Sequence, residues 1–156
     1  MTGLKLKACF WCLDPLLSQN IMTILKEGKF YVQKKDVNER KKIKQILLED
    51  PPDLVISDFD LPDHQRTAIE EEMEAYMSEI PLIYLVGEKN VRKAADPLKS
   101  GVWDFVQKDQ LYKLVPSVYS SQKYANLFRK RKEAEQALNE SRDRYMSIFK
   151  SVHDGI

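Results

Sequence analysis

The feature that most constrains this chain is a regular alternation of short apolar runs and amphipathic segments over the first 116 residues. Such alternation is typical of βαβ units and a parallel sheet. Three of the runs are almost continuously apolar, as expected when helices cover both faces of the sheet. The predicted strands are residues 6–12, 30–33, 54–57, 82–86 and 103–106. We therefore predict an α/β fold with five parallel strands.

The segments between the strands carry helix start and stop signals. Asp14 and Pro15 stand in the order of an N-cap residue followed by the first helical residue, and Gly28 ends that helix. Pro97 removes a backbone donor inside the fourth helix, which we therefore expect to be short or kinked. The remaining helices are expected over residues 41–48, 65–77 and 90–100.

The last third of the chain has a different character. No glycine occurs between residues 110 and 150, and Pro116 falls early enough to occupy a first helical turn. One helix of roughly 30 to 40 residues is predicted, far above the usual length. A coiled coil with a second copy is expected because a single helix would leave its apolar side chains in water. The side chains that would be left in water are Phe128, Leu138 and Phe149. They belong to a stripe of apolar residues at spacings near three and four or their multiples, formed by Val115, Val118, Ala125, Phe128, Leu138, Tyr145 and Phe149.

Charge and glycine content exclude several functions. The chain has 25 Lys and Arg against 24 Asp and Glu, a net charge of +1, so no global field favours nucleic acid or an anionic membrane. No apolar run is long enough for a spanning helix, and we expect a cytoplasmic protein. With five glycines and no phosphate-binding glycine loop, a flavodoxin-like enzyme or nucleotide binder is disfavoured.

Residues that often mark metal or redox sites have simpler interpretations here. Cys9 and Cys12 lie in a predicted strand, which places their Cα atoms roughly 10 Å apart, beyond disulfide reach. Free thiols are therefore expected. His64 is expected in a solvated loop, because a soft-metal site needs three or four converging groups. The run of residues 70–72, three glutamates, is expected to be a solvated helix face.

The most informative segment is residues 53–63, where an apolar strand ends at Asp58 and a Leu-Pro turn follows. Ligand chemistry in doubly wound sheets occurs at this carboxyl edge. A second motif runs from Gly101 through a short strand to Lys108. Over roughly residues 4–125 the chain resembles the receiver domains of two-component response regulators.

The resemblance implies a flavodoxin-like doubly wound sheet in the order 2-1-3-4-5, and a signalling module that is not an enzyme. Asp58 matches the phosphoacceptor, and Lys108 the cation that pairs with the acceptor and then with the phosphoryl group. We expect these two side chains within salt-bridge distance. Val86 and Phe105 match the two switch positions of the family.

Three departures from the family pattern concern chemistry. Cys12 and Leu13 stand where receivers have two acidic residues that hold Mg²⁺. Val86 replaces the hydroxyl residue that bonds the phosphoryl group, and Arg66 replaces a turn glycine. Mg²⁺ is therefore expected to bind weakly, with candidate ligands Asp14, Asp58 and Asp60, and Asp14 has the alternative role of capping the first helix.

The tail offers another resemblance. Residues 140–149 and 154–156 look like the opening of a PAS sensor domain. The expected organisation is a receiver-like domain over residues 1–125, a linker helix over 126–140 and the start of a PAS domain over 141–156. The expected function is a degenerate receiver-like module of a multidomain two-component protein that acts through protein interaction and its C-terminal helix. The alternative is a functional receiver phosphorylated on Asp58 by a histidine kinase.

Overall fold

The computed structural model describes residues 3–94 and 101–154. The five strands form one parallel sheet in the order β2-β1-β3-β4-β5, which confirms the predicted order. The strands are β1 (Leu4–Trp11), β2 (Phe30–Val37), β3 (Leu54–Asp58), β4 (Leu82–Val86) and β5 (Asp104–Gln107). The helices are α1 (Pro15–Glu27), α2 (Arg40–Glu49), α3 (Asp63–Met73), η1 (Glu88–Asn90), η2 (Leu111–Lys113) and α5 (Leu114–Asp154).

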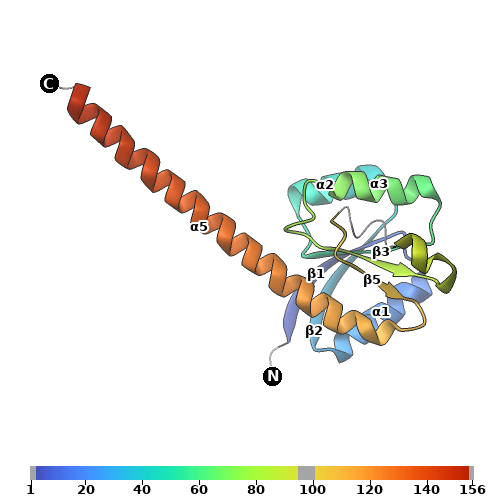
Figure 1. Ribbon diagram of the computed structural model, residues 1–156. Coiled ribbons are helices and arrows are strands. Elements are labelled where there is room, and N and C mark those ends of the chain that lie inside the picture. Colours follow the sequence, from blue (N-terminus) through green and yellow to red (C-terminus); the bar gives the residue numbers. More distant parts are fainter. Residues whose placement is uncertain (1–2, 95–100, 155–156) are drawn as a thin grey trace.

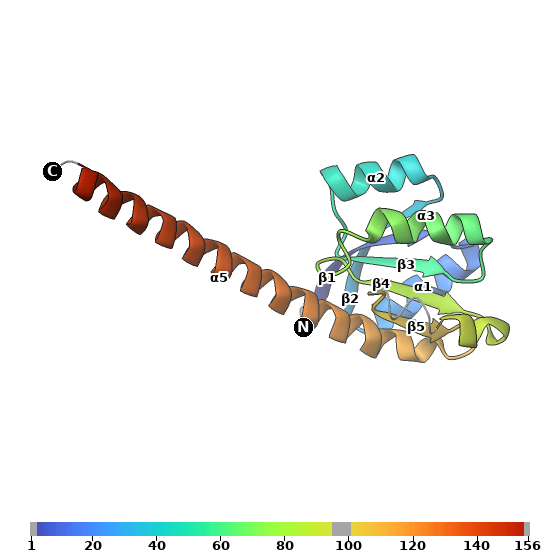
Figure 2. The ribbon, with the colours of Figure 1, turned by 45° about the horizontal axis from the view of Figure 1, so that its top comes forward.

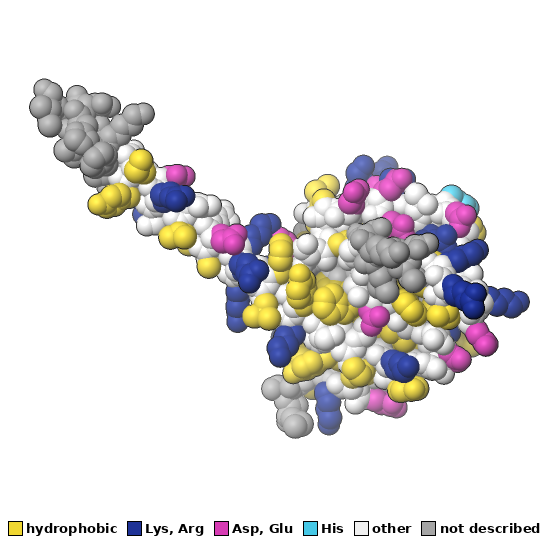
Figure 3. All heavy atoms as spheres, in the orientation of Figure 1, with side chains coloured by type: hydrophobic (Ala, Val, Ile, Leu, Met, Phe, Trp, Pro, Cys, Tyr) yellow, Lys and Arg dark blue, Asp and Glu magenta, His cyan; other side chains and the backbone are white. Residues whose placement is uncertain are grey.

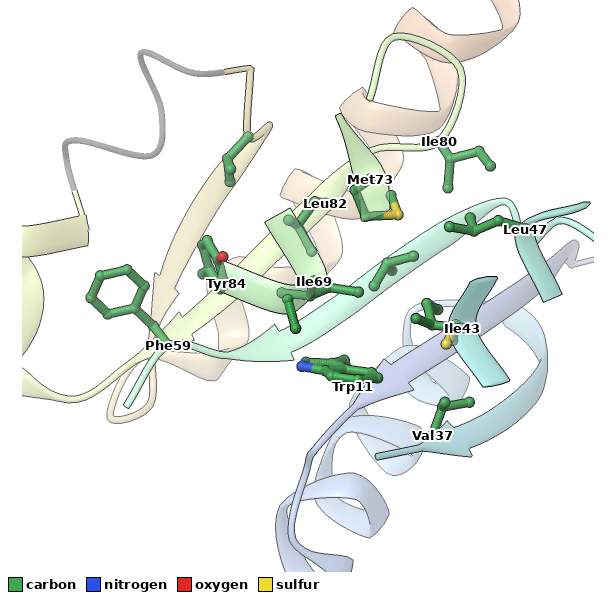
Figure 4. Close-up of a cluster of buried hydrophobic side chains, with 14 of the residues drawn as sticks. Trp11, Val37, Ile43, Leu47, Phe59, Ile69, Met73, Ile80, Leu82 and Tyr84 are labelled. Carbon is green, nitrogen blue, oxygen red and sulfur yellow. The ribbon is translucent and has the colours of Figure 1, made fainter. Parts of the chain in front are cut away.

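Helices cover both faces of the sheet, with α2 and α3 on one side and α1 and the start of α5 on the other (Figures 1 and 2). Each layer has its own apolar core. In one core, Ile43 of α2 and Ile69 of α3 pack over Trp11, as Figure 4 shows. In the other core, Ile21 of α1 and Val118 of α5 pack against the strand side chains that point to the opposite face of the sheet. Successive side chains of a strand point to opposite faces, which explains the continuous apolar runs.

The predicted start of α1 is confirmed in detail. The Asp14 carboxylate accepts hydrogen bonds from the backbone N–H groups of Leu16 at 2.8 Å and Leu17 at 3.2 Å. Pro15 occupies the first turn, where its missing N–H costs nothing. Gly28 then ends the helix by donating its backbone N–H to Ile24.

Most boundaries differ from the sequence prediction by one or two residues, and three differences have a clear cause. Strand β2 continues to Val37 because it pairs with β1 along its whole length, although much of it is polar. Strand β1 ends at Trp11, one residue early, because Cys12 has a φ of 53° and turns the chain out of the sheet. Helix α3 runs from Asp63 to Met73, and hydrogen-bonded turns replace its predicted last residues before Pro81.

The fourth helix can be compared only in part. Residues 91–94 are helical after η1. Pro97, on which the expected kink depends, lies outside the described residues.

Helix α5 is a single helix of 41 residues that leaves the body and extends far beyond it (Figure 1). Its first part is anchored by Leu114, Val118 and Ala125, none of which is exposed to solvent. Further along the helix, Lys132 Nζ forms an ion pair with Glu79 Oε1 of the body at 2.6 Å. No helix within residues 3–94 and 101–154 has the length and apolar character needed to cross a membrane.

Candidate functional site

Two acidic side chains and one lysine meet at the carboxyl edge of the sheet. Asp58 is the last residue of β3, and Lys108 follows β5 directly. The Lys108 ammonium lies 2.9 Å from Asp58 Oδ1 and 2.8 Å from Asp60 Oδ2. The expected proximity of Asp58 and Lys108 is therefore confirmed. Lys108 also pairs with a second carboxylate, that of Asp60.

Asp60 is the more heavily bonded of the two carboxylates. Its Oδ2 accepts from the backbone N–H of Gly87 at 2.8 Å, and its Oδ1 accepts from the side-chain amide of Asn90 at 2.6 Å. Burial alone would raise the pKa of Asp60, but the hydrogen bonds from Asn90, Lys108 and Gly87 outweigh it and lower the pKa. Asp60 is therefore held as a carboxylate.

Lys108 is stabilised in its charged form by the same contacts. Partial burial opposes the charge, but hydrogen bonds to Asp60 and Asp58 raise the pKa of Lys108 above its ordinary value. The turn after β3 is closed by the Asp60 backbone N–H, which donates to Asp58 Oδ1 at 2.8 Å. This bond fixes Asp60 beside Asp58.

The end of β1 supplies no acidic group to this edge. The Cys12 side chain is partly buried, and burial together with the nearby Asp58 charge raises the pKa of its thiol. Leu13 packs against the apolar core on the α1 side of the sheet. Cys9 and Cys12 are both free thiols, as expected.

The residues present do not fit a Mg²⁺ ion well. Within residues 3–94 and 101–154, no three His, Cys, Asp or Glu side chains are grouped as a metal site would require. The three candidate ligands are already engaged: Asp14 caps α1, and Asp58 and Asp60 pair with Lys108. A hard cation would need to compete with an ammonium for the same oxygens.

Val86 and Phe105 were expected at switch positions. Val86 is completely buried, and its carbonyl accepts from the Lys108 backbone N–H at 2.9 Å. Its side chain offers no hydroxyl to the site. Phe105 is partly buried against the core formed with α2 and α3. A switching role for either residue remains a prediction.

The expectation of a solvated face over residues 70–72 holds for Glu71, which is exposed, whereas Glu70 and Glu72 are partly buried. Arg40 of α2 donates to Glu71 at 2.7 Å and to Glu72 at 2.8 Å. The buried Tyr84 hydroxyl donates to Glu70 at 2.6 Å, and burial with this bond raises the pKa of Tyr84. These glutamates therefore join α3 to α2 and to β4, which the sequence alone does not reveal because their partners are distant in the chain.

Arg66 and His64 lie in the first turns of α3. Arg66 spans the start of the helix, with its guanidinium 4.4 Å from the Phe59 ring centroid and hydrogen bonds to the Phe59 carbonyl and to Asp63. Its long side chain occupies this turn where a receiver has glycine. His64 is exposed, as expected, although it belongs to the helix and not to a loop.

Sequence reasoning missed Gly87 and Asn90 as partners of Asp60. The only signal was their position, directly after a buried strand and therefore at the same sheet edge. A Cβ atom added at Gly87 would lie 2.7 Å from Asp60 Oδ2. The φ of Gly87 is −76°, which other residues also adopt. The absence of a side chain, and not the backbone conformation, therefore lets this carboxylate approach so closely.

No family model and no curated protein matches the sequence. Solved structures do match. A response regulator receiver domain from Clostridium thermocellum has a TM-score of 0.63 at 19% identity, over 78% of this chain and 97% of that one. A protein described as an adenylate cyclase from Rhodopirellula baltica has a TM-score of 0.69 at 15% identity, over 85% and 98%.

A longer protein also matches. NtrX from Brucella abortus, in complex with ADP, has a TM-score of 0.64 at 13% identity, over 86% of this chain and 29% of that one. The chain thus spans under a third of NtrX. At these identities the matches establish the fold, which is the flavodoxin-like fold of receiver domains.

Proposed function

We propose that this chain is a receiver-like signalling module of a multidomain two-component protein. In this proposal its acidic pocket is degenerate, and the module acts through protein interaction and its C-terminal helix. The fold and the pairing of Asp58 with Lys108 support a receiver-like origin. Cys12 and Leu13, at the end of the first strand, support the loss of metal-dependent chemistry.

The observation that carries the proposal is the double engagement of Lys108. This ammonium is the cation that an incoming phosphoryl group would need, and it already pairs with both Asp58 and Asp60. Phosphoryl transfer depends on positioned positive charge around the transferred group. With Leu13 and a neutral Cys12 thiol nearby, modification of Asp58 would add negative charge without a compensating cation.

A specific feature favours the alternative, a receiver phosphorylated on Asp58 by a histidine kinase. The bonds from Lys108 and from the Asp60 backbone both go to Oδ1 of Asp58. The second oxygen, Oδ2, is therefore the atom that would attack a phosphoryl donor. In this alternative Asp14 supplies part of the missing metal site.

The proposed partner is a second copy of the chain, bound along α5. Leu138 and Tyr145 are 70% and 74% exposed and stand seven residues apart, on one side of the helix. Figure 3 shows apolar and charged side chains along the projecting part of α5. Residues 141–154, which resemble the opening of a PAS domain, continue the same helix.

Two measurements on the full chain test the proposal. Incubation with Mg²⁺ and acetyl phosphate, followed by intact mass spectrometry, is expected to leave Asp58 unmodified. A stoichiometric phosphoryl adduct that the Asp58→Asn variant lacks would favour the alternative.

The second measurement is light scattering at high protein concentration. Wild type is expected to be dimeric, and the double variant Leu138→Lys, Tyr145→Lys monomeric. The matched control, Gln136→Lys with Ser147→Lys, adds the same charge on the opposite side of α5 and is expected to stay dimeric. A monomeric wild type would remove the dimer from the proposal.

A further inference from the structure

The environment of Asp60 is that of a bound anion. Three donors from two segments converge on its carboxylate: the Gly87 backbone N–H and the Asn90 side-chain amide from the segment after β4, and the Lys108 ammonium after β5. One donor is charged, and all three lie within 2.8 Å of a carboxylate oxygen. Such sets of ammonium and N–H donors recognise oxyanions in general.

The space around Gly87 shows how closely the Asp60 carboxylate approaches the backbone. Any side chain at this position would place its Cβ 2.7 Å from Asp60 Oδ2. The backbone conformation of Gly87 is open to other residues. With any other residue at this position, the Asp60 carboxylate would have to shift away from the backbone N–H.

Asp60 reaches this site because of its place in the chain. Asp58 ends β3, and the bond from the Asp60 N–H to Asp58 Oδ1 bends the following turn. The Asp60 side chain then crosses toward the ends of β4 and β5, while only 24% of it remains exposed. The carboxylate thus links the turn after β3 to the segments that follow β4 and β5.

We propose that Gly87, Asn90 and Lys108 form an oxyanion site that Asp60 closes as a tethered internal ligand. The external ligand class that this site excludes is the phosphate group or another small oxyanion such as sulfate. The inference rests on the proposed function and deepens it, since a permanent internal anion would hold the loops in one arrangement without phosphorylation. Tethering gives Asp60 an effective concentration on the order of millimolar or higher, so dilute free phosphate does not displace it.

The test uses the full chain labelled with ¹⁵N and titrated with inorganic phosphate and with sulfate. Wild type is expected to show no saturable shift of the Gly87 amide signal. Asp60→Ala vacates the site and is expected to bind phosphate at least about tenfold more tightly than wild type, with a saturable Gly87 shift. Asp109→Ala is the control, because it removes the same charge from an exposed residue beside Lys108.

Two results would overturn the inference: equal phosphate binding by wild type and Asp60→Ala, or no phosphate binding at Gly87 in Asp60→Ala. Gly87→Ala provides a second test if Asp60→Ala does not fold. It is expected to expel the carboxylate and to return the pKa of Asp60, measured by ¹³C NMR, toward its ordinary value of 3.8. An unchanged Asp60 pKa in Gly87→Ala would contradict the proposed position of the Asp60 carboxylate against Gly87.

The outcomes are separable from those for the proposed function. A phosphoryl adduct on Asp58 of wild type would overturn the proposed function and leave the Gly87 measurements interpretable. Phosphate binding by wild type at Gly87, without an adduct on Asp58, would overturn only the internal-ligand inference.

Discussion

Replacing Lys108 with methionine removes the only charge in the described residues that pairs with both Asp58 and Asp60. Methionine keeps most of the apolar stem and loses the ammonium. The two carboxylates would then face each other without a cation, at an edge where Asp58 is 16% exposed and Asp60 24% exposed. We expect the native state to be destabilised mainly by this uncompensated charge.

The magnitude follows from partial burial. Breaking a fully buried ion pair costs about 3 to 5 kcal/mol, whereas an exposed pair contributes about 0 to 1 kcal/mol. Lys108 is 30% exposed and serves two carboxylates, so an intermediate loss of roughly 2 to 3 kcal/mol in the free energy of unfolding is expected.

The assay is urea denaturation followed by the fluorescence of the buried Trp11. With a urea dependence of about 1 to 3 kcal/mol/M for a domain of this size, the midpoint should fall by about 0.7 to 3 M at neutral pH. Lys113→Met is the matched control, because Lys113 is exposed and its loss should change stability by no more than about 0.5 kcal/mol.

The pH dependence identifies the cause. The pKa of Asp60 is lowered on folding, so its contribution to stability is present above its unfolded value of 3.8 and is lost as the pH falls through the folded value. The difference between wild type and Lys108→Met should therefore shrink in acid. Equal destabilisation at neutral and acid pH, or a loss no larger than that of Lys113→Met, would refute the reasoning.

Three further predictions concern single side chains. Asp14→Ala should lower the free energy of unfolding by about 1 kcal/mol in urea denaturation, because two backbone N–H groups of α1 lose their acceptor. Tyr84→Phe should cost about 1 to 3 kcal/mol by the same assay, since Glu70 loses a donor, whereas Tyr31→Phe at an exposed site should not. Alkylation of Cys12, followed by mass spectrometry, should be slow at neutral pH and accelerate only above about pH 9, because its thiol pKa is raised.

Much of the fold could be predicted because the relevant signals are local. The apolar runs that became β3 and β4 are buried almost throughout, so their composition identifies them directly. The N-cap of α1 is likewise determined by adjacent residues. The pairing of Asp58 with Lys108 is implied by the resemblance to receiver domains, and the structure places both residues at the carboxyl edge of the sheet.

The errors arose where partners are distant in the sequence. Strand β2 lies at the sheet edge, so residues 33–36 keep their polar side chains in water while their backbone pairs with β1, and no apolar pattern marks them. The glutamates of α3 accept hydrogen bonds from Arg40 and Tyr84 because the fold packs α3 beside α2 and β4.

The bonding of Asp60 could not be predicted for the same reason. The three donors lie in two segments, after β4 and after β5, that are separated from Asp60 by many residues, and each of them is unremarkable by composition. A glycine after a strand usually indicates a turn, whereas Gly87 is required by the space that a carboxylate occupies.

Because α5 is one continuous helix, the number of residues in it sets the rotation of its C-terminal part relative to the body. A helix of 41 residues is roughly 60 Å long, and each residue turns the direction of the side chains by about 100°. Inserting or deleting one residue between Lys132 and Glu140 would therefore rotate residues 141–154 by about 100° about the helix axis relative to the body. A change of seven residues would nearly restore the original orientation, displaced by about 10 Å along the axis.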